Sequence, residues 1–359
     1  MAYTAIDDPS AHFHTQLYTG NGSSGLAITN DANAGDFKPD WLWIQPRSNG
    51  DNSVVWDSSR TVNKRLKTNS DAAEDSDTTA LVTFETDGFD LDTTDTNFNG
   101  SSRTYVAWQW IANGGSTTTN DASATGVGTI DSVYQANTTA GFSIVSYTGT
   151  GSAGTIAHGL GATPSTMIVK NRSKGAGESW LVYHHKNTSA PETDYLLLNS
   201  NGATSDNDIA WNDTAPTSTV FSVKDDDSTN DSGETFIAYL FTEIQGYSKF
   251  GGYTGNGDAD GIFIYTGFKP ALFIWKDASS TGGWGMIDNK RDPYNEGFFQ
   301  LGPDDTDGDA DYAIGDFLSN GVKMRNTFGD TNGSGIEHVY WAFAENPFVT
   351  SGGVPCTAR

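Results

Sequence analysis

The chain has almost no cysteine and few positive charges. Cys356 is the single cysteine among 359 residues, so no intrachain disulfide can form and a disulfide-stapled secreted scaffold is excluded. Lysine and arginine total 20 against 45 aspartates and glutamates, which gives a formal net charge of -25. A surface of this sign repels phosphate groups, so we expect no nucleic-acid partner and no docking on anionic membranes.

Long apolar segments are also missing. No apolar run approaches the roughly 20 residues that a membrane-crossing helix needs, and residues 1–8 lack the basic region and apolar core of a signal peptide. Apolar three-four spacing is always broken within three turns by a glycine, asparagine or aspartate. The sequence therefore predicts a protein that is made in a cytoplasm, has no long helices and does not insert into a membrane.

Turn-forming and aromatic residues, by contrast, are abundant. The chain carries 41 glycines, together with 10 tryptophans, 14 tyrosines and 19 phenylalanines. Glycine supplies the backbone conformations of tight turns, and aromatic side chains favour strands. This composition predicts short strands joined by tight turns.

Three landmarks recur in a constant order along the chain. They are an opening Tyr-Thr-Gly-x-Gly string, a proline next to an apolar run, and a closing aromatic segment that contains an alanine. The copies open at Tyr18, Tyr147 and Tyr253, place their prolines at Pro39, Pro164 and Pro270, and close at Ala107, Ala238 and Ala342. The intervals from opening tyrosine to closing alanine are 89, 91 and 89 residues. Constant order at near-constant spacing indicates a threefold internal repeat.

Each landmark suits a strand or a strand end, because glycine and asparagine allow the turn and the proline fixes the start of an apolar strand. We therefore predict an all-β fold of three tandem β-sandwich (jelly-roll-like) repeat domains of about ninety residues. The predicted organisation is an N-terminal attachment arm (1–16), β repeat 1 (17–111), a Gly/Ser/Thr-rich linker (112–141), β repeat 2 (142–245), β repeat 3 (246–345) and a C-terminal tail (346–359).

The spacers between the repeats differ in length. Residues 112–141 are mostly glycine, serine, threonine and asparagine, which is typical of a flexible or extended connector. The second and third repeats should therefore form a pair, with the first set apart. Each repeat also has a tryptophan 14 to 17 residues after its proline, at Trp56, Trp180 and Trp284, and we interpret these as core positions, with exposed binding rings as the alternative.

Three segments give the chain a resemblance to known proteins. They are the repeated Tyr-Thr-Gly-Asn-Gly, the string from Gly246 to Tyr253, and the ending from Ala342 to Phe348; residues 212–221 add to the likeness. In these features the chain resembles an uncharacterised family of tail-fibre-like or structural proteins of tailed phages, especially those of marine bacteria and cyanobacteria. The resemblance implies localisation in the virion and carries no catalytic residues.

The function expected from this resemblance is a fibre or receptor-binding appendage that contacts a host surface glycan or protein. We expect a homotrimer, attached to other virion proteins through the N-terminal arm. A capsid decoration or head-fibre protein is the first alternative. A glycan-binding module acting outside a virion and a glycan hydrolase are the others.

Enzyme activity finds little support in the residues. The chain has no Gly-x-Ser-x-Gly elbow between a strand and a helix. His184 and His185 follow a predicted strand, and adjacent residues on a strand point to opposite faces, so the two rings are poorly placed to act together. With 45 acidic residues, carboxylate pairs occur by composition alone. We predict that the protein is not an enzyme.

Two patterns are candidate metal ligands. Asp305, Asp307, Asp309 and Asp311 alternate like the first half of a calcium loop, which makes Ca²⁺ the one candidate cofactor. Ala310 stands where the turn glycine of such a loop is expected, and a solvated acidic loop is the alternative interpretation. His12 and His14 form the second pattern, because on an extended strand both rings project to one side and could meet at a threefold axis. An ordinary N-terminal arm is the alternative there.

Overall fold

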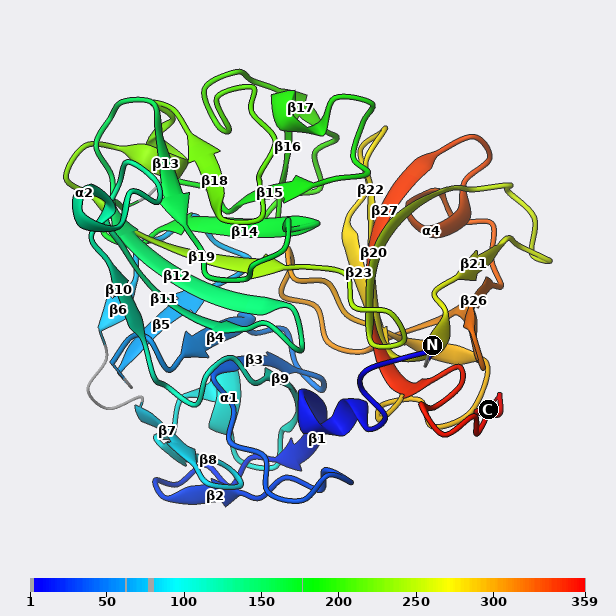
Figure 1. Ribbon diagram of the computed structural model, residues 1–359. Helices are drawn as coiled ribbons and strands as arrows, with labels where there is room; N and C mark the ends of the chain where they lie inside the picture. Colours follow the sequence, from blue (N-terminus) through cyan, green and yellow to red (C-terminus); the bar gives the residue numbers. More distant parts are fainter. Residues whose placement is uncertain (1–2, 62, 77–80, 176, 359) are drawn as a thin grey trace.

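The computed structural model describes residues 3–61, 63–76, 81–175 and 177–358, and it confirms the all-β class. Its strands fall into three groups, which we call repeat 1 (β1 to β9), repeat 2 (β10 to β19) and repeat 3 (β20 to β27). In Figure 1 the groups surround a common centre, with repeat 1 in blue to cyan, repeat 2 in green and repeat 3 in yellow to red. The helices of the described residues are single turns, and none is long and apolar enough to cross a membrane.

The bounds of the elements are as follows. A 3₁₀ turn, η1 (Pro9–Ala11), precedes repeat 1, which comprises β1 (Phe13–Thr19), β2 (Leu26–Ile28), β3 (Trp41–Pro46), β4 (Val54–Asp57), β5 (Lys64–Lys67), β6 (Asp75–Ser76), β7 (Leu81–Glu85), β8 (Gly88–Asp92), α1 (Thr96–Asn99) and β9 (Thr104–Trp110). Repeat 2 comprises β10 (Thr118–Asn120), α2 (Ala122–Thr125), β11 (Ser132–Asn137), β12 (Phe142–Thr148), β13 (Gly154–Ala157), β14 (Thr166–Asn171), β15 (Leu181–His184), η2 (Pro191–Thr193), β16 (Asp194–Leu197), β17 (Ser205–Asp206), β18 (Val220–Val223), α3 (Asp227–Asn230) and β19 (Thr235–Phe241). Repeat 3 comprises β20 (Ser248–Thr254), β21 (Phe263–Tyr265), β22 (Phe268–Asp277), β23 (Trp284–Asp288), β24 (Gly297–Gln300), β25 (Ala310–Leu318), β26 (Gly321–Met324), α4 (Gly329–Asn332) and β27 (Glu337–Pro347).

The strand order of the main sheet is the same in each repeat. The opening strand pairs with the closing strand, which pairs with the strand at the proline landmark, which pairs with the strand after it. This gives β1-β9-β3-β4, β12-β19-β14-β15 and β20-β27-β22-β23, all antiparallel. A smaller sheet forms a second layer in each repeat, with orders β2-β8-β7, β13-β18 and β21-β26-β25-β24. Each repeat is therefore a two-layer β unit built on one topology.

Two kinds of core hold the repeats. Each repeat has its own apolar cluster on one face of the main sheet, against the smaller sheet. A fourth cluster lies on the opposite faces of the three main sheets and contains residues of all three repeats. Central strands such as β3 and β22 are buried along almost their whole length, because both faces of these sheets are covered.

The shared core brings together the closing strands of all three repeats. The ring centroids of Trp110 on β9 and Phe343 on β27 lie 5.3 Å apart, those of Trp110 and Phe241 on β19 lie 6.2 Å apart, and those of Phe241 and Phe343 lie 5.5 Å apart. Full burial of one such side chain stabilises the fold by about 1.5–3 kcal/mol. The expectation that the second and third repeats pair while the first stands apart is therefore wrong, since apolar residues on both faces require cover from both neighbours.

The Tyr-Thr-Gly-x-Gly landmark has the same structural role in each repeat. Its tyrosine hydroxyl donates to a carbonyl in the single-turn helix before the closing strand, in the pairs Tyr18–Phe98, Tyr147–Thr229 and Tyr253–Thr331, at 2.8, 2.5 and 2.8 Å. The first glycine has to be glycine, because a Cβ on Gly20 would lie 2.4 Å from a backbone oxygen, with similar clashes at the equivalent positions. The tyrosine hydroxyl therefore joins the opening strand to the single-turn helix in each repeat. This shared role explains why the landmark recurs in the sequence.

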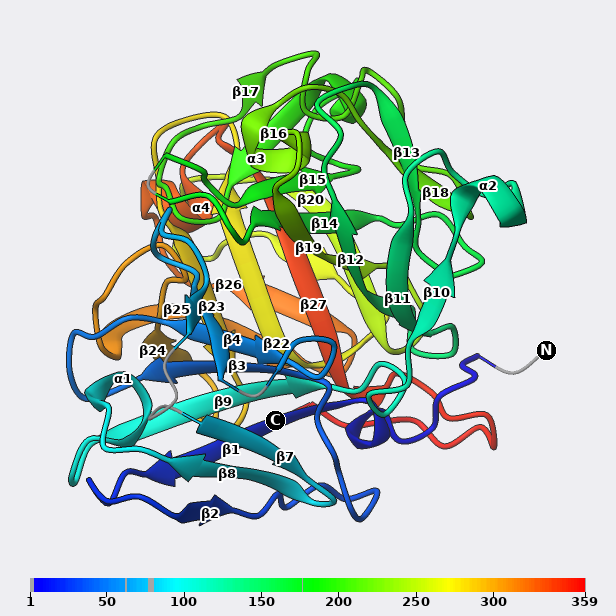
Figure 2. The same cartoon turned by 90° about the vertical axis from the view of Figure 1, so that its left-hand side faces the viewer.

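The predicted linker is part of a sheet. Residues 112–141 contain β10, α2 and β11, and β11 pairs along its whole length with β12, as Figure 2 shows. Gln135 of β11 also donates to the hydroxyls of Ser58 and Ser59, at 2.8 and 2.7 Å. The prediction of a flexible connector from composition was wrong. Strands pair through backbone groups, and serine and threonine have the same backbone groups as apolar residues.

The predicted arm lies against repeat 3. The Tyr3 hydroxyl donates to the carbonyl of Gly267 at 2.6 Å, and the Thr4 hydroxyl donates to that of Gln245 at 3.0 Å. Ile6 is buried in the shared core, and residues 13–16 already belong to β1. The described part of the arm is thus held within the fold.

Candidate functional site

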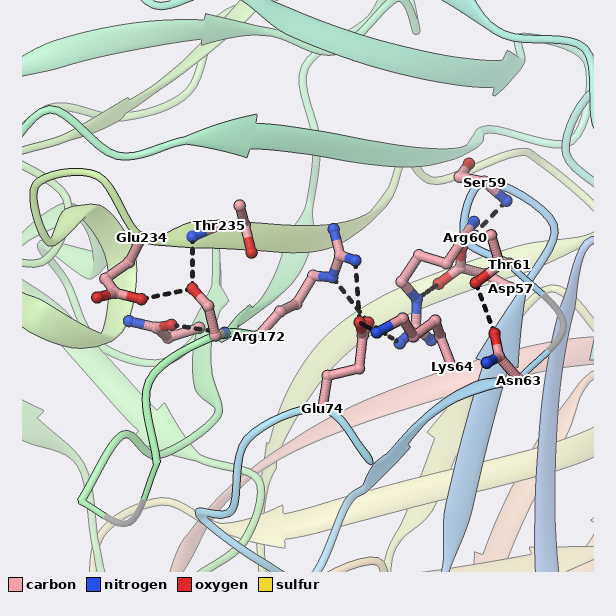
Figure 3. Close-up of polar contacts among 12 residues, drawn as sticks. Asp57, Ser59, Arg60, Thr61, Asn63, Lys64, Glu74, Arg172, Glu234 and Thr235 are labelled. Carbon is pink, nitrogen blue, oxygen red and sulfur yellow. Dashed lines mark hydrogen bonds and ion pairs between the residues drawn. The ribbon is translucent and has the colours of Figure 1, made fainter. Parts of the chain in front are cut away.

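Buried charges join repeat 1 to repeat 2. We call this cluster seam 1/2; it comprises Asp57, Arg60 and Glu74 from repeat 1, with Arg172 and Tyr239 from repeat 2. Figure 3 shows Asp57, Arg60, Glu74 and Arg172. Arg60 contacts Asp57 at 2.6 Å and Glu74 at 2.9 Å, and Arg172 contacts Glu74 at 2.8 Å. The Tyr239 hydroxyl donates to Asp57 at 2.7 Å. The side chains of Asp57 and Arg60 are 0% and 1% exposed.

The electrostatics of seam 1/2 indicate a structural cross-link. Burial alone would raise the pKa of Glu74, but hydrogen bonds from Arg172 and the charge of Arg60 lower this pKa to about 2. Glu74 is thus held as a carboxylate and not poised to exchange a proton near neutral pH. Each carboxylate of the seam touches a guanidinium, which is the arrangement that makes a buried charge tolerable.

The same constellation recurs between repeats 3 and 1, and we call it seam 3/1. Arg291 contacts Asp288 at 2.6 Å and Asp309 at 3.0 Å, while Arg47 of repeat 1 contacts Asp309 at 2.8 Å. The indole of Trp108 donates to Asp288 at 3.2 Å. Trp108 and Tyr239 occupy equivalent positions on β9 and β19, so seam 3/1 matches seam 1/2 group for group.

The third boundary, seam 2/3, is built on the same backbone contact, but neutral residues occupy the positions of the paired charges. The amide of Thr204 donates to the carbonyl of Ala278 at 2.9 Å. In the charged seams the amides of Glu74 and Asp309 donate in the same way to the carbonyls of Arg172 and Arg47, both at 2.7 Å. Threonine and alanine therefore replace an acid and an arginine at seam 2/3.

The remaining positions of seam 2/3 are also neutral. His184 and Asn187 stand where the charged seams have an aspartate and an arginine, and His184 contacts the carbonyl of Tyr340 at 3.2 Å. Burial, followed by the charge of His185, lowers the pKa of His184 to about 3. Within the described residues, neither the indole nitrogen of Trp341 nor the side-chain nitrogen of Asn187 has a hydrogen-bond partner. Seam 2/3 thus contains two buried hydrogen-bond donors that the described residues leave without an acceptor.

The structure separates the four aspartates of the predicted calcium loop. Asp309 belongs to seam 3/1, and Asp311 is exposed on β25 opposite Phe299. Asp305 and Asp307 remain together, because the amide of Asp307 donates to the Asp305 carboxylate at 3.0 Å. Among the described residues, no group of three or more histidine, cysteine or acidic side chains is placed to hold a metal ion.

His12 and His14 contact different neighbours. His14 is buried and lies 3.0 Å from Asp31, whereas the His12 ring packs edge-on against Tyr247 at 5.8 Å. Burial lowers the pKa of both rings. His12 precedes β1 in a non-extended conformation, so the alternation that the prediction required is not present.

A cleft of about 490 Å³ lies in repeat 3, between the Asp-rich loop and α4. Its walls are the end of β24, the loop from Gly302 to Gly308, the start of β25 and the first residues of α4. Its polar side chains include Asp305, Asp307 and Asp330. This size falls in the range of about 300–1,000 Å³ that is usual for small-ligand sites.

Two aromatic rings line the cleft. Tyr312 is 47% exposed and Phe328 is 49% exposed, and their rings meet edge to face with centroids 5.6 Å apart. Among the described residues, the other large aromatic side chains that are exposed are Phe263, Tyr265 and Tyr294. All five belong to repeat 3, and in the described parts of repeats 1 and 2 no aromatic side chain is exposed to this degree.

Phe328 breaks the pattern of the other repeats. It is the N-cap of α4 and makes no side-chain capping bond. The equivalent caps are Asp95 before α1 and Asp226 before α3, whose carboxylates accept the amides of Asn97 and Ser228. Aspartate is a favoured N-cap and phenylalanine is not, so the needs of the helix do not explain this residue.

An acid with an altered pKa lies behind the cleft. Asp304 accepts the amide of Trp284 at 3.2 Å. Burial, followed by the charge of Asp305, raises the pKa of Asp304 to about 7, and burial also raises the pKa of Asp305. The charge of the loop residue that precedes Asp305 therefore changes near neutral pH.

Sequence reasoning placed candidate ligands in this loop but missed Tyr312 and Phe328. One signal was available for Phe328, because the residue preceding each single-turn helix is aspartate in two repeats and phenylalanine in the third. No comparable signal existed for Tyr312, since sequence alone cannot tell an exposed ring from a buried one.

Comparison with known proteins adds one match. A family model described as Domain of unknown function (DUF7483) matches residues 8–347, which span all three repeats. A search of curated proteins finds no relative of the chain. The match treats the repeats as one unit, in agreement with their shared core. The chain therefore belongs to the DUF7483 family, whose function is unknown.

Proposed function

We propose that the protein is a non-enzymatic structural component of a tailed-phage particle and contacts the host surface through repeat 3. The observation that carries the proposal is that the exposed aromatic side chains of the described residues belong to repeat 3, where two of them line the cleft. Exposed rings are a signature of recognition surfaces, because they combine a large contact area with few rotatable bonds. The virion context rests on the resemblance to phage structural proteins.

The charged seams support the non-enzymatic part of the proposal. They are the clusters of acids and bases that most resemble catalytic machinery, yet their carboxylates are paired with arginines in the fold. A general base needs a lone pair that is free to reach a substrate. The seams have a sufficient structural explanation.

The test is localisation in purified particles, followed by adsorption. Mass spectrometry and antibody-labelled electron microscopy should find the chain on the outside of the particle. The purified protein should bind host cells and compete with phage adsorption, because it would occupy the same receptors. Absence from the particle would remove the virion proposal. Presence on the capsid without any effect on adsorption would favour the decoration alternative.

The homotrimer and attachment through the N-terminal arm remain predictions. Three equivalent β units already surround one centre within a single chain, so a trimer is not needed to complete the core. Light scattering on the purified chain would decide its oligomeric state. Deletion of residues 1–8, scored by incorporation into particles, would test the arm, with the melting temperature as a control because Ile6 is buried.

A further inference from the structure

The cleft of repeat 3 combines rings with hydrogen-bond acceptors. Tyr312 and Phe328 present apolar ring surface, and the carboxylates of Asp305, Asp307 and Asp330 present acceptors without donors. Gln300 adds a side-chain amide to the lining. A matching ligand has an apolar face about one ring wide and several hydroxyl groups around its edge.

A pyranose sugar has this chemistry. The axial C–H groups of one face form an apolar patch that lies on an aromatic ring, while the equatorial hydroxyls donate to carboxylates. The edge-to-face arrangement of Tyr312 and Phe328 offers ring surfaces in two directions, with centroids 5.6 Å apart. A volume of about 490 Å³ provides room for more than one sugar unit.

The charge of the cleft restricts the class of sugar that it can bind. The acids of the cleft belong to a chain with a net charge of -25, and the described residues that line the cleft include no lysine or arginine. A uronic or sialic acid would place its carboxylate beside these carboxylates without a compensating cation, which is costly. Uncharged saccharides avoid this repulsion.

We propose that the cleft between the 302–308 loop and α4 binds an uncharged saccharide, which lies on Tyr312 and Phe328 and donates its hydroxyls to Asp305, Asp307 and Asp330. This inference rests on the proposed function, since it names the ligand through which repeat 3 contacts a host surface. Phe328 is the strongest single indication. It occupies a position where repeats 1 and 2 carry a helix-capping aspartate, so an exposed ring has replaced a stabilising residue at the mouth of the cleft.

The test compares the full-length protein with three variants. Phe328→Asp restores the cap of the other repeats, so it should fold with an unchanged or higher melting temperature. Tyr312→Ala removes the second ring. Phe263→Ala is the matched control, because Phe263 is a ring of similar exposure on the same sheet that does not line the cleft.

The probes are cellotriose, maltotriose and triacetylchitotriose, with trigalacturonate as the anionic counterpart. Saturation-transfer NMR and calorimetry should detect binding of at least one neutral probe and none of trigalacturonate. Phe328→Asp and Tyr312→Ala should each weaken the affinity about tenfold or more, and Phe263→Ala by less than about twofold. Failure of all three neutral probes, or binding unaffected by both cleft variants, would overturn the inference. A response to CaCl₂ alone that Asp305→Asn abolishes and Phe328→Asp leaves intact would also overturn it, in favour of a cation site.

Cell binding separates this inference from the proposed function. If the wild-type protein and Phe328→Asp bind host cells equally well, repeat 3 contacts the host by another surface and only the cleft inference fails. If the cleft binds a neutral saccharide but the protein neither binds host cells nor occurs in particles, the proposed function fails and the saccharide site stands.

Discussion

Seams 1/2 and 2/3 connect equivalent parts of the fold with opposite chemistry. Seam 1/2 holds two acids and two arginines in direct contact, whereas seam 2/3 has histidine, asparagine, threonine and alanine at the same four positions. Both keep the backbone hydrogen bond that links one repeat to the next. The charges are therefore not needed to make this junction, because the apolar core and the backbone contact are present without them.

The difference concerns specificity more than net stability. Removing two acids and two arginines from water costs about as much as their mutual attraction returns. The charged set is then replaceable as a whole but not one member at a time. The neutral seam has a smaller penalty for burial, but within the described part of the chain two of its buried donors have no partner.

The largest effect should come from breaking one charged pair. Arg60→Met leaves Asp57 buried without its cation, while Glu74 keeps Arg172. The free energy of unfolding should therefore fall by about 3–5 kcal/mol. Asn187→Ala, at the matching position of seam 2/3, should cost about 1 kcal/mol, the value of its hydrogen bond with Thr204. Urea denaturation at pH 7 measures both. Equal losses in the two variants would mean that the seams do not differ as described.

Acid should weaken the neutral seam before the charged one. The pKa of His184 is about 3 in the fold against 6.5 in its absence, so the unfolded chain binds more protons between these values. Stability from this residue is therefore lost as pH falls below 6.5, by up to about 1.4 kcal/mol per pH unit. The matching loss from Glu74 begins only below its ordinary pKa of 4.5 and extends to about pH 2.

The variant His184→Gln isolates this contribution, because glutamine does not titrate. Its free energy of unfolding relative to the wild type should rise by about 2–3 kcal/mol between pH 6.5 and pH 4.5. The other histidines titrate in both proteins, so their contributions cancel in the difference. Parallel pH curves for the two proteins would contradict the assignment.

Transplanting the neutral seam should cost less than breaking the charged one. The combination of Asp57→His, Arg60→Asn, Glu74→Thr, Arg172→Ala and Tyr239→Phe replaces every charged group of seam 1/2 and removes the hydroxyl that would lose its acceptor. We expect a loss of about 1–2 kcal/mol, below that of Arg60→Met alone. Denaturation of the two variants side by side checks this order. A larger loss in the five-fold variant would show that the charges contribute net stability.

The smallest effect tests whether the repeats are alike away from the seams. Tyr18→Phe, Tyr147→Phe and Tyr253→Phe each remove one hydroxyl that donates to a helix carbonyl. Each should cost about 1 kcal/mol, because a single neutral hydrogen bond is lost. Thermal unfolding monitored by circular dichroism is sensitive enough. A threefold spread among the variants would reveal repeats that differ in more than their seams.

The sequence predicted the existence of the repeats better than it predicted how the repeats pack against one another. The tyrosine and glycine landmarks have local causes, namely a hydroxyl that reaches the next helix and a glycine that a Cβ would not fit, and local causes leave a spacing signature. The shared core depends on both faces of strands such as β3 and β22 being apolar. The sequence shows this double-sided burial as apolar runs at β3 and β22. Such runs do not indicate which sheet packs against each face.

The candidate site was predictable in part. The Asp-x-x-Arg spacing of Asp57 with Arg60, and of Asp288 with Arg291, marks two seams within the sequence, while Arg172 and Arg47 come from other repeats and only the fold supplies them. Asp309 was predicted to be a metal ligand because no feature of the neighbouring sequence shows that Arg47 and Arg291 contact it. The prediction of a linker at residues 112–141 was wrong, because its strands pair through backbone groups and composition does not reveal this.

The pairing of the opening strand with the closing strand has a consequence for connectivity. The chain enters and leaves each repeat at one place, so the order of the repeats along the chain is not fixed by their packing. The first residues already contact repeat 3 and the tail, where the amide of Ser351 donates to Asp7 at 2.6 Å. The molecule is in this sense a ring that is open at one point. A circular permutant joined at the present ends and opened in the exposed loop 113–117 should fold to the same structure.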